Sequence, residues 1–168
     1  MAFASTQDLD DPNKKETLLN NLDKIYFRTR NISKENSAIH TGEKYEANLK
    51  EMLHNFSNET IKVIIKDNKN IDWSKIQSEK KIALHRILQE LMVNMKKHSH
   101  CSFVIIGFEN HNNSIEINYS DNGIGFVNEL NLKNGLQNVE NRIHAINGTI
   151  TFDSETNKGF KSKISFPK

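Results

Sequence analysis

The sequence has one cysteine and no apolar run long enough to cross a membrane. A single cysteine, Cys101, excludes an intramolecular disulfide and a zinc site built from several cysteines. A membrane-spanning helix needs about 20 mostly apolar residues in a row. The first residues, MAFASTQDLDDPNKKE, lack the apolar core of a secretory signal. We therefore expect a cytoplasmic chain, or the cytosolic part of a membrane-anchored protein, with no direct membrane contact of its own.

The sequence also lacks a strong excess of charge of either sign. Its 23 Lys and Arg residues nearly balance 21 Asp and Glu residues, for a net charge of +2. So small a value gives no reason to expect a nucleic-acid partner or an anionic membrane surface. The length of 168 residues fits one globular domain with an additional element.

Hydrophobic spacing divides the chain in two. The segment from Lys14 to Ile32 has a narrow apolar stripe at helical spacing. The polar stretch from Ser33 to Glu43 interrupts this pattern. We predict a tail with one helix over residues 1–40 and a globular domain over residues 41–168.

The domain shows helical and strand patterns in an order that does not alternate regularly. This segregation predicts an α+β fold, a two-layer α/β sandwich, with the extra N-terminal helix outside it. The expected helices are Tyr45–Phe56, Ser78–Lys97 and a helix led by Gly135 that ends at Ile146, before the stop signal Asn147-Gly148. The expected strands are Lys62–Lys66, Phe103–Phe108, Ile115–Tyr119, Thr149–Asp153 and Lys161–Phe166.

Three polar side chains are expected to share one face of the long helix. Glu90, Asn94 and Lys97 are separated by four and three residues. A carboxylate can orient or deprotonate a nucleophile, an amide oxygen suits a hard cation, and an ammonium suits phosphate oxygens. Taken alone, this triplet favours the plain alternative, a solvated helix face.

A glycine-containing turn follows the strand that ends near Tyr119. It reads Asp121-Asn122-Gly123-Ile124-Gly125-Phe126. Glycines at this spacing let the backbone approach a ligand closely, and a carboxylate at a strand end can accept a hydrogen bond from an exocyclic amine such as that of adenine. An ordinary hairpin turn is the alternative, but no alternating strand follows directly.

The third feature is Asn134-Gly135-Leu136 at the start of the last helix. Exposed backbone N–H groups and the helix dipole favour an anion at such a position. A simple helix cap explains this feature when it stands alone.

Taken together, the three segments resemble the ATPase superfamily of DNA gyrase, Hsp90, histidine kinases and MutL. The similarity is to histidine kinases with a very short ATP lid, and it implies a Bergerat-type ATP-binding fold. The blocks that carry it are RILQELMVNMKKHS (Arg86–Ser99), DNGIGF (Asp121–Phe126) and GLQNVENRIHAINGTI (Gly135–Ile150). The polar stretch Val127–Asn134 would be the lid, and Leu18–Glu35 is similar to the second helix of a dimerisation and phosphotransfer hairpin.

The resemblance implies roles for individual residues. Glu90 corresponds to the catalytic glutamate that helps to activate the nucleophile, Asn94 to the magnesium-binding asparagine, and Asp121 to the aspartate that bonds the adenine amine. The other ATP-binding correspondences are Lys97 and His98 near the phosphates, Gly123 and Gly125 in the first glycine segment, and Gly135 and Leu136 at the end of the second.

The sequence departs from the family pattern at three points. Lys133 stands where the second glycine segment usually begins with glycine. Phe160 stands where a threonine usually helps to hold adenine. None of the seven histidines is followed by an acidic residue, as the phosphoacceptor of this class typically is.

The expected function is therefore an ATP-binding histidine kinase domain that uses magnesium. It would transfer the γ-phosphoryl group of ATP to a histidine on a phosphotransfer hairpin outside this fragment, and a response regulator would then receive it. With half of a four-helix interface, the fragment would form at most a weak homodimer. Two alternatives remain open: a degenerate nucleotide-binding interaction module, which Lys133 and Phe160 motivate, and a serine kinase of the anti-sigma type.

Overall fold

The computed structural model describes residues 39–67, 71–125 and 133–168. The helix expected at Lys14–Ile32 lies outside the described residues, and so does most of the lid expected at Val127–Asn134. The last two lid residues, Lys133 and Asn134, instead belong to a helix. The described part contains three α-helices, a 3₁₀ turn and a π-helical segment: α2 (Tyr45–His54), η2 (Trp73–Lys75), α3 (Ser78–Asn94), η3 (Met95–Ser99, the π-helix) and α4 (Lys133–His144).

The strands of the described part form one mixed, five-stranded sheet in the order β1-β2-β3-β5-β4. β1 runs parallel to β2, and the other neighbours are antiparallel. Because β1 and β2 are parallel, the chain crosses between them through α3. The strands are β1 (Lys62–Asp67), β2 (Phe103–Asn110), β3 (Ser114–Asp121), β4 (Thr149–Ser154) and β5 (Phe160–Pro167).

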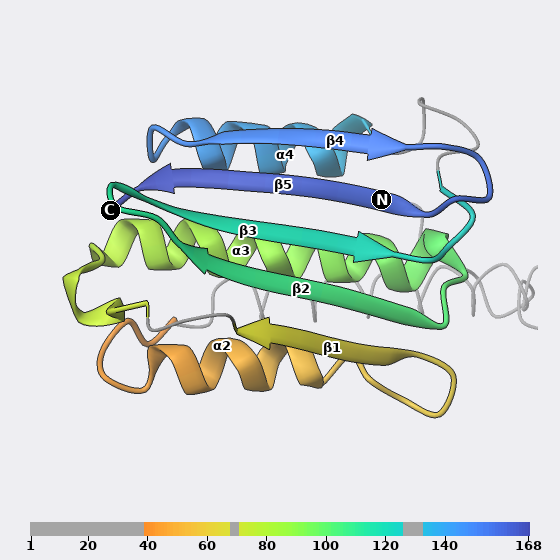
Figure 1. Ribbon diagram of the computed structural model, residues 1–168, viewed down its shortest axis with the longest axis horizontal. Coiled ribbons are helices and arrows are strands. Elements are labelled where there is room, and N and C mark those ends of the chain that lie inside the picture. The colour runs from red at the N-terminus through yellow and green to blue at the C-terminus, as the bar shows by residue number, and fades with distance from the viewer. Residues whose placement is uncertain (1–38, 68–70, 126–132) are drawn as a thin grey trace, which may run out of the picture. The chain divides into compact units, whose positions relative to one another are not determined.

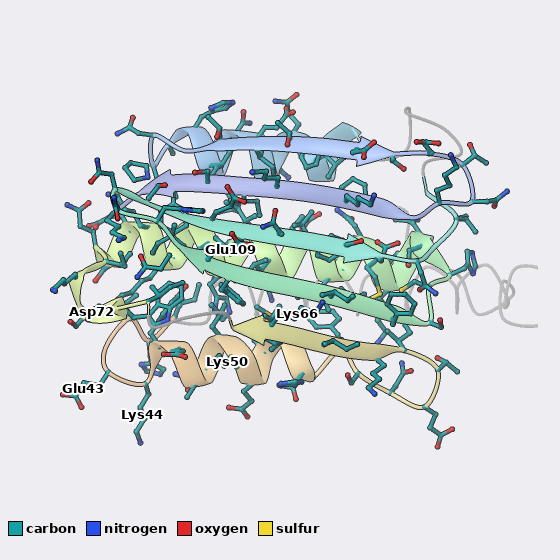
Figure 2. The ribbon with its side chains drawn as sticks, in the orientation of Figure 1. Glu43, Lys44, Lys50, Lys66, Asp72 and Glu109 are labelled. Atoms are coloured by element: carbon teal, nitrogen blue, oxygen red, sulfur yellow. The ribbon has the colours of Figure 1, made fainter. Side chains whose placement is uncertain are left out.

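The helices cover one face of the sheet, as Figure 1 shows. β2 and β3 alternate between buried and more exposed residues, which places every second side chain against the helices. On the other face Glu109 remains 43% exposed at its side chain, and Figure 2 shows it against the uncovered side of the sheet. The two-layer α+β sandwich predicted from the sequence is confirmed.

The core lies between the sheet and the long helix α3. α3 buries one stripe because its apolar residues recur at intervals of three and four. α2 adds Tyr45, Leu49 and Leu53, which are spaced four apart and are all at most 1% exposed. The buried residues that α3 and the two central strands contribute include Leu84, Ile87, Leu88, Leu91, Met92, Val104, Ile106, Phe108, Ile115 and Ile117.

The end of α4 agrees with its predicted stop signal. Asn147 takes the left-handed conformation with φ 56°, and the N–H of Gly148 donates to the carbonyl oxygen of Ile143 at 2.9 Å. This is the arrangement that satisfies the free carbonyl groups of a helix end. The turn leads directly into the hairpin of β4 and β5, which was also predicted.

No helix among the described residues has the length and apolar character needed to cross a bilayer.

Candidate nucleotide-binding site

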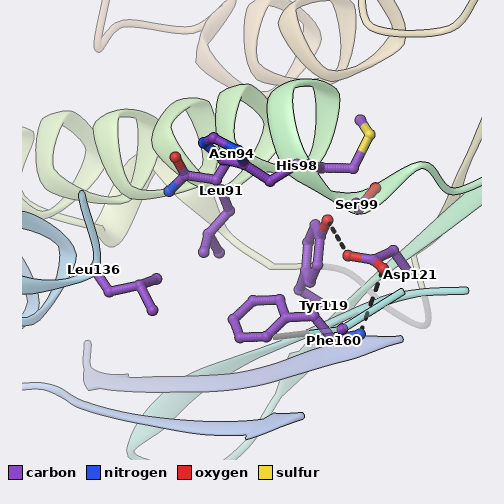
Figure 3. Close-up of a pocket in the computed structure, with 10 residues that line it drawn as sticks. Leu91, Asn94, His98, Ser99, Tyr119, Asp121, Leu136 and Phe160 are labelled. Carbon is purple, nitrogen blue, oxygen red and sulfur yellow. Dashed lines mark hydrogen bonds between the residues drawn. The ribbon is translucent and has the colours of Figure 1, made fainter. Parts of the chain in front are cut away.

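A cavity opens between the end of α3, the strands β3 and β5, and the start of α4 (Figure 3). Its volume is about 390 Å³, counted out to its open mouth. Small-molecule sites commonly combine apolar walls with a few polar groups. The lining residues are Leu91, Asn94, Met95, His98, Ser99, Tyr119, Asp121, Gly125, Leu136 and Phe160.

Asp121 supplies the acidic group of the cavity. It is the last residue of β3 and only 4% exposed. Its Oδ1 accepts hydrogen bonds from the N–H groups of Gly123 at 2.9 Å and Phe160 at 3.4 Å, and its Oδ2 accepts one from the hydroxyl of Tyr119 at 3.0 Å. These donors fix the carboxylate at one end of the cavity, where it can accept a hydrogen bond from a ligand.

Asn94 lies on the helical side of the same cavity. It is the last residue of α3, and its buried Nδ2 has no hydrogen-bond partner among the described residues. A buried polar atom without a partner is unusual in a folded protein, and a ligand is one common explanation. The amide nitrogen therefore offers a donor to a molecule in the cavity.

The first turn of α4 packs closely on this part of α3. A side chain at Gly135 would begin 2.7 Å from Glu90 Oε1 and 3.1 Å from Asn94 Nδ2, so any larger residue would displace these groups. Leu136, the next residue, lines the cavity. α4 begins at Lys133, two residues before the expected start, so Gly135 lies within its first turn. The side chain of Lys133 falls outside the described part of the structure.

The structure replaces the expected end of the long helix with a π-helix. The sequence predicted an α-helix through Lys97, but α3 ends at Asn94 and η3 continues to Ser99. π-helical turns use i→i+5 hydrogen bonds and are wider than α-helical turns. Glu90 and Asn94 keep their predicted common face on α3, since both approach Gly135, but Lys97 lies beyond the end of that helix. His98, which was predicted beside Lys97, lines the cavity together with Ser99, whereas Lys97 is exposed and is absent from the lining.

Glu90 flanks the cavity without lining it. The side chain is half-buried and reaches toward the first turn of α4, as its distance to the Gly135 position shows. The structure thus brings together Asn94, His98, Asp121, Gly125 and Leu136 as lining residues, and it places Glu90 and Gly135 at the border.

Gly123 holds the turn after β3 against the π-helix. The position of a Cβ atom on Gly123 is only 2.2 Å from the carbonyl oxygen of Ser99. The N–H of the next residue, Ile124, donates to that same oxygen at 2.8 Å. The glycine is needed because the two backbones approach too closely for any side chain.

Tyr119 and Ser99 are lining residues that the sequence did not predict. Tyr119 could have been predicted, because it precedes Asp121 by two positions on a strand and must point to the same face. Ser99 could not have been predicted, because its position depends on the π-helix. Phe160, identified as a departure from the family pattern, is a half-buried part of the cavity wall.

Residues 79–168 match the protein family described as histidine kinase-, DNA gyrase B-, and HSP90-like ATPase. The matched segment covers more than half of the 168 residues. The chain therefore belongs to this family, and the superfamily resemblance drawn from the sequence is confirmed.

Two curated relatives carry names from the same class. The chain is 33% identical over 90 residues to sensor histidine kinase ComP of Bacillus subtilis, across 51% of this chain and 12% of that protein. It is 28% identical over 101 residues to oxygen sensor histidine kinase NreB of Staphylococcus carnosus, across 58% of this chain and 29% of that protein. The chain thus spans less than a third of the length of either relative.

Solved structures share the fold. A histidine kinase domain from the blue-light activated histidine kinase of Erythrobacter litoralis superposes with a TM-score of 0.61 at 15% identity, covering 76% of this chain and 60% of that one. Acinetobacter baumannii histidine kinase AdeS gives a TM-score of 0.56 at 16% identity, covering 94% and 85%. At these identities the similarity establishes the architecture alone.

Proposed function

We propose that this chain is the ATP-binding catalytic part of a two-component sensor histidine kinase. The observation that carries the proposal is the joint position of Asp121 and Asn94 in one cavity. The carboxylate lies at one end, and the amide, whose Nδ2 has no partner among the described residues, lies at the other. Membership of the ATPase family and the names of the two curated relatives support it.

The adenine end of the site is built around Asp121. An ionised carboxylate accepts hydrogen bonds only, so Asp121 selects a base with an amine donor. Leu91, Met95 and Phe160 supply apolar walls for the base. Apolar walls around one polar group give an orienting contact whose strength increases as water is excluded.

The phosphate end lies beside Asn94, His98 and the start of α4. The N-terminus of α4, within which Gly135 lies, directs backbone N–H groups outward, and such a helix start favours anions. Lys97 is exposed on the adjoining π-helix and supplies positive charge to this region.

The residues at the phosphate end fit a magnesium ion. The amide oxygen of Asn94 is of the type that magnesium prefers. The Nδ2 atom of the same amide has no partner among the described residues, and as a donor it suits a phosphate oxygen. When bound, magnesium would neutralise negative charge on the phosphate oxygens. Asn94 is the residue that would hold it.

The proposed reaction transfers the γ-phosphoryl group of ATP to a histidine outside this chain. Glu90 would accept the proton of the attacking imidazole or hold that ring in place, because its carboxylate stands at the border of the cavity. Such transfers depend chiefly on positioning and charge stabilisation. The product phosphohistidine would then pass its phosphoryl group to a response regulator.

The proposed function also implies a domain organisation and a set of partners. Residues 1–40 would contribute part of a dimerisation and phosphotransfer hairpin, and residues 41–168 the catalytic domain. The fragment would act in the cytoplasm, or as the cytosolic part of a membrane-anchored sensor, and would form at most a weak homodimer. It would contact neither nucleic acid nor the membrane directly.

The direct test combines ATP titration with a transfer assay. We expect ATP binding that is stronger with magnesium and labelling of a supplied phosphotransfer hairpin at its histidine. Tight binding without transfer would favour a second candidate, a nucleotide-holding interaction module, which the phenylalanine in the cavity wall at position 160 favours. Transfer to a serine substrate in place of histidine would contradict the proposal.

A further inference from the structure

Tyr119 lines the cavity and is hydrogen-bonded to Asp121, the residue proposed to bind the base. Its hydroxyl donates to Asp121 Oδ2 at 3.0 Å, while Oδ1 is bonded by two main-chain N–H groups (Figure 3). Among the described residues, Tyr119 is the one whose side chain donates to this carboxylate. Both residues are buried, at 2% exposure for Tyr119 and 4% for Asp121.

The hydroxyl of Tyr119 carries its proton at neutral pH and donates it to Asp121. Burial raises the pKa of Tyr119 above its usual value, and the nearby charge of Asp121 raises it further. The phenol therefore stays protonated at neutral pH. A phenol has a single hydrogen to donate, and this one is directed to Asp121.

The ring of Tyr119 is fixed by its neighbours. Its centroid lies 5.8 Å from that of Phe160, and Phe160 stacks on Phe152 at 5.8 Å with an interplanar angle of 27°. These rings come from the adjacent strands β3, β5 and β4. Because the ring is held between strands, the hydroxyl has a defined position relative to the carboxylate.

We propose that Tyr119 is a positioning residue that sets the nucleobase preference of the cavity through Asp121. Its hydroxyl holds the plane of the carboxylate, so that an oxygen lone pair remains directed into the cavity for an exocyclic amine. A base that carries a carbonyl at the same place brings an oxygen against the carboxylate, with no proton between them. This inference rests on the proposed nucleotide-binding function and specifies which side chain gives it selectivity.

The test compares ATP with inosine triphosphate, in which a carbonyl replaces the adenine amine. Calorimetric affinities would be measured on the full chain for the unmodified protein, Tyr119→Phe, Asp121→Asn and the double variant. Tyr119→Phe keeps the ring and removes only the hydroxyl. We expect it to weaken ATP binding by about five- to tenfold. This is less than the loss of a direct hydrogen bond to a charged group, because Tyr119 acts on the ligand only through Asp121. Binding of inosine triphosphate should change by much less.

The double variant decides whether Tyr119 acts through the carboxylate. If it does, Tyr119→Phe has little further effect once Asp121 is asparagine, and the two changes are strongly non-additive. Tyr45→Phe is the matched control. Tyr45 is also buried, at 1% exposure, and its hydroxyl donates to the carbonyl oxygen of Lys81 at 2.7 Å, away from the cavity. This control should leave both affinities unchanged.

The outcomes separate this inference from the function on which it rests. Suppose that the unmodified protein prefers ATP. If Tyr119→Phe keeps that preference, or weakens the binding of both nucleotides equally, the role of Tyr119 is overturned and the proposed function still stands. Additive effects in the double variant also overturn that role. An unmodified protein that binds neither ligand, or both equally, overturns the proposed base contact itself and the inference with it.

Discussion

The carbonyl oxygen of Ser99 accepts a hydrogen bond from the N–H of Ile124 at 2.8 Å. This contact joins the last residue of the π-helix to the turn that follows Asp121. It therefore fixes the two polar borders of the cavity relative to one another, and Gly123 makes the approach possible.

Replacing Gly123 by alanine should destabilise the fold. The added Cβ would lie 2.2 Å from the Ser99 oxygen, and both backbones would have to move. Crowding of this kind costs about 1–3 kcal/mol. Urea unfolding followed by circular dichroism measures the change. Gly42→Ala is the control, because nothing lies within 4 Å of a Cβ at Gly42. Equal stabilities for the two variants would show that the Ser99 contact is less rigid than we infer.

Replacing Asn94 by alanine should reduce the effect of magnesium on ATP binding. In the unmodified protein, ATP affinity should fall when magnesium is removed by a chelator. In Asn94→Ala the two affinities should approach one another, because the oxygen that would hold the ion is gone. Asn48→Ala, another half-buried helical asparagine but one remote from the cavity, is the matched control. An unchanged magnesium dependence in Asn94→Ala would remove the metal role of this residue.

Acid should weaken the fold through His85. Burial lowers the pKa of His85, and the charge of Arg86 lowers it further. Its buried Nδ1 has no partner among the described residues. Between the lowered folded pKa and the unfolded value of about 6.5, the unfolded chain binds more protons, so stability rises with pH. The contribution is complete above about pH 6.5 and is lost as the pH falls through the folded pKa.

Urea unfolding at several pH values between about 5 and 7 checks this prediction against the usual histidine pKa. His85→Gln should flatten the pH dependence, whereas His144→Gln, at an exposed position on α4, should not. If the slope is the same with and without His85, another group causes the acid sensitivity.

The order of helices and strands could be predicted from the sequence because buried apolar residues recur at the spacing of a strand or a helix. Val104, Ile106 and Phe108 alternate on β2, and the apolar residues of α3 recur at helical spacing. The stop signal Asn147-Gly148 also acted as predicted. These features depend on neighbours along the chain, which the sequence lists directly.

The features that were not predicted depend on contacts between distant residues. The π-helix after Asn94 ends where Ser99 meets the turn at Ile124, a contact between separate elements that no local pattern encodes. For this reason Lys97 was expected in the cavity with His98, but His98 and Ser99 are the residues that line it. The bond from Tyr119 to Asp121 was likewise missed, although strand alternation places both on one face.

The central claim is that Asp121 receives the exocyclic amine of adenine. Calorimetric titration of ATP into the unmodified protein and Asp121→Asn tests it directly, with Asp153→Asn as a control for loss of an exposed carboxylate on β4. We predict that Asp121→Asn weakens binding by about 1.5–3 kcal/mol, or roughly 10- to 150-fold, and that the control does not. An affinity unchanged by Asp121→Asn would contradict the account.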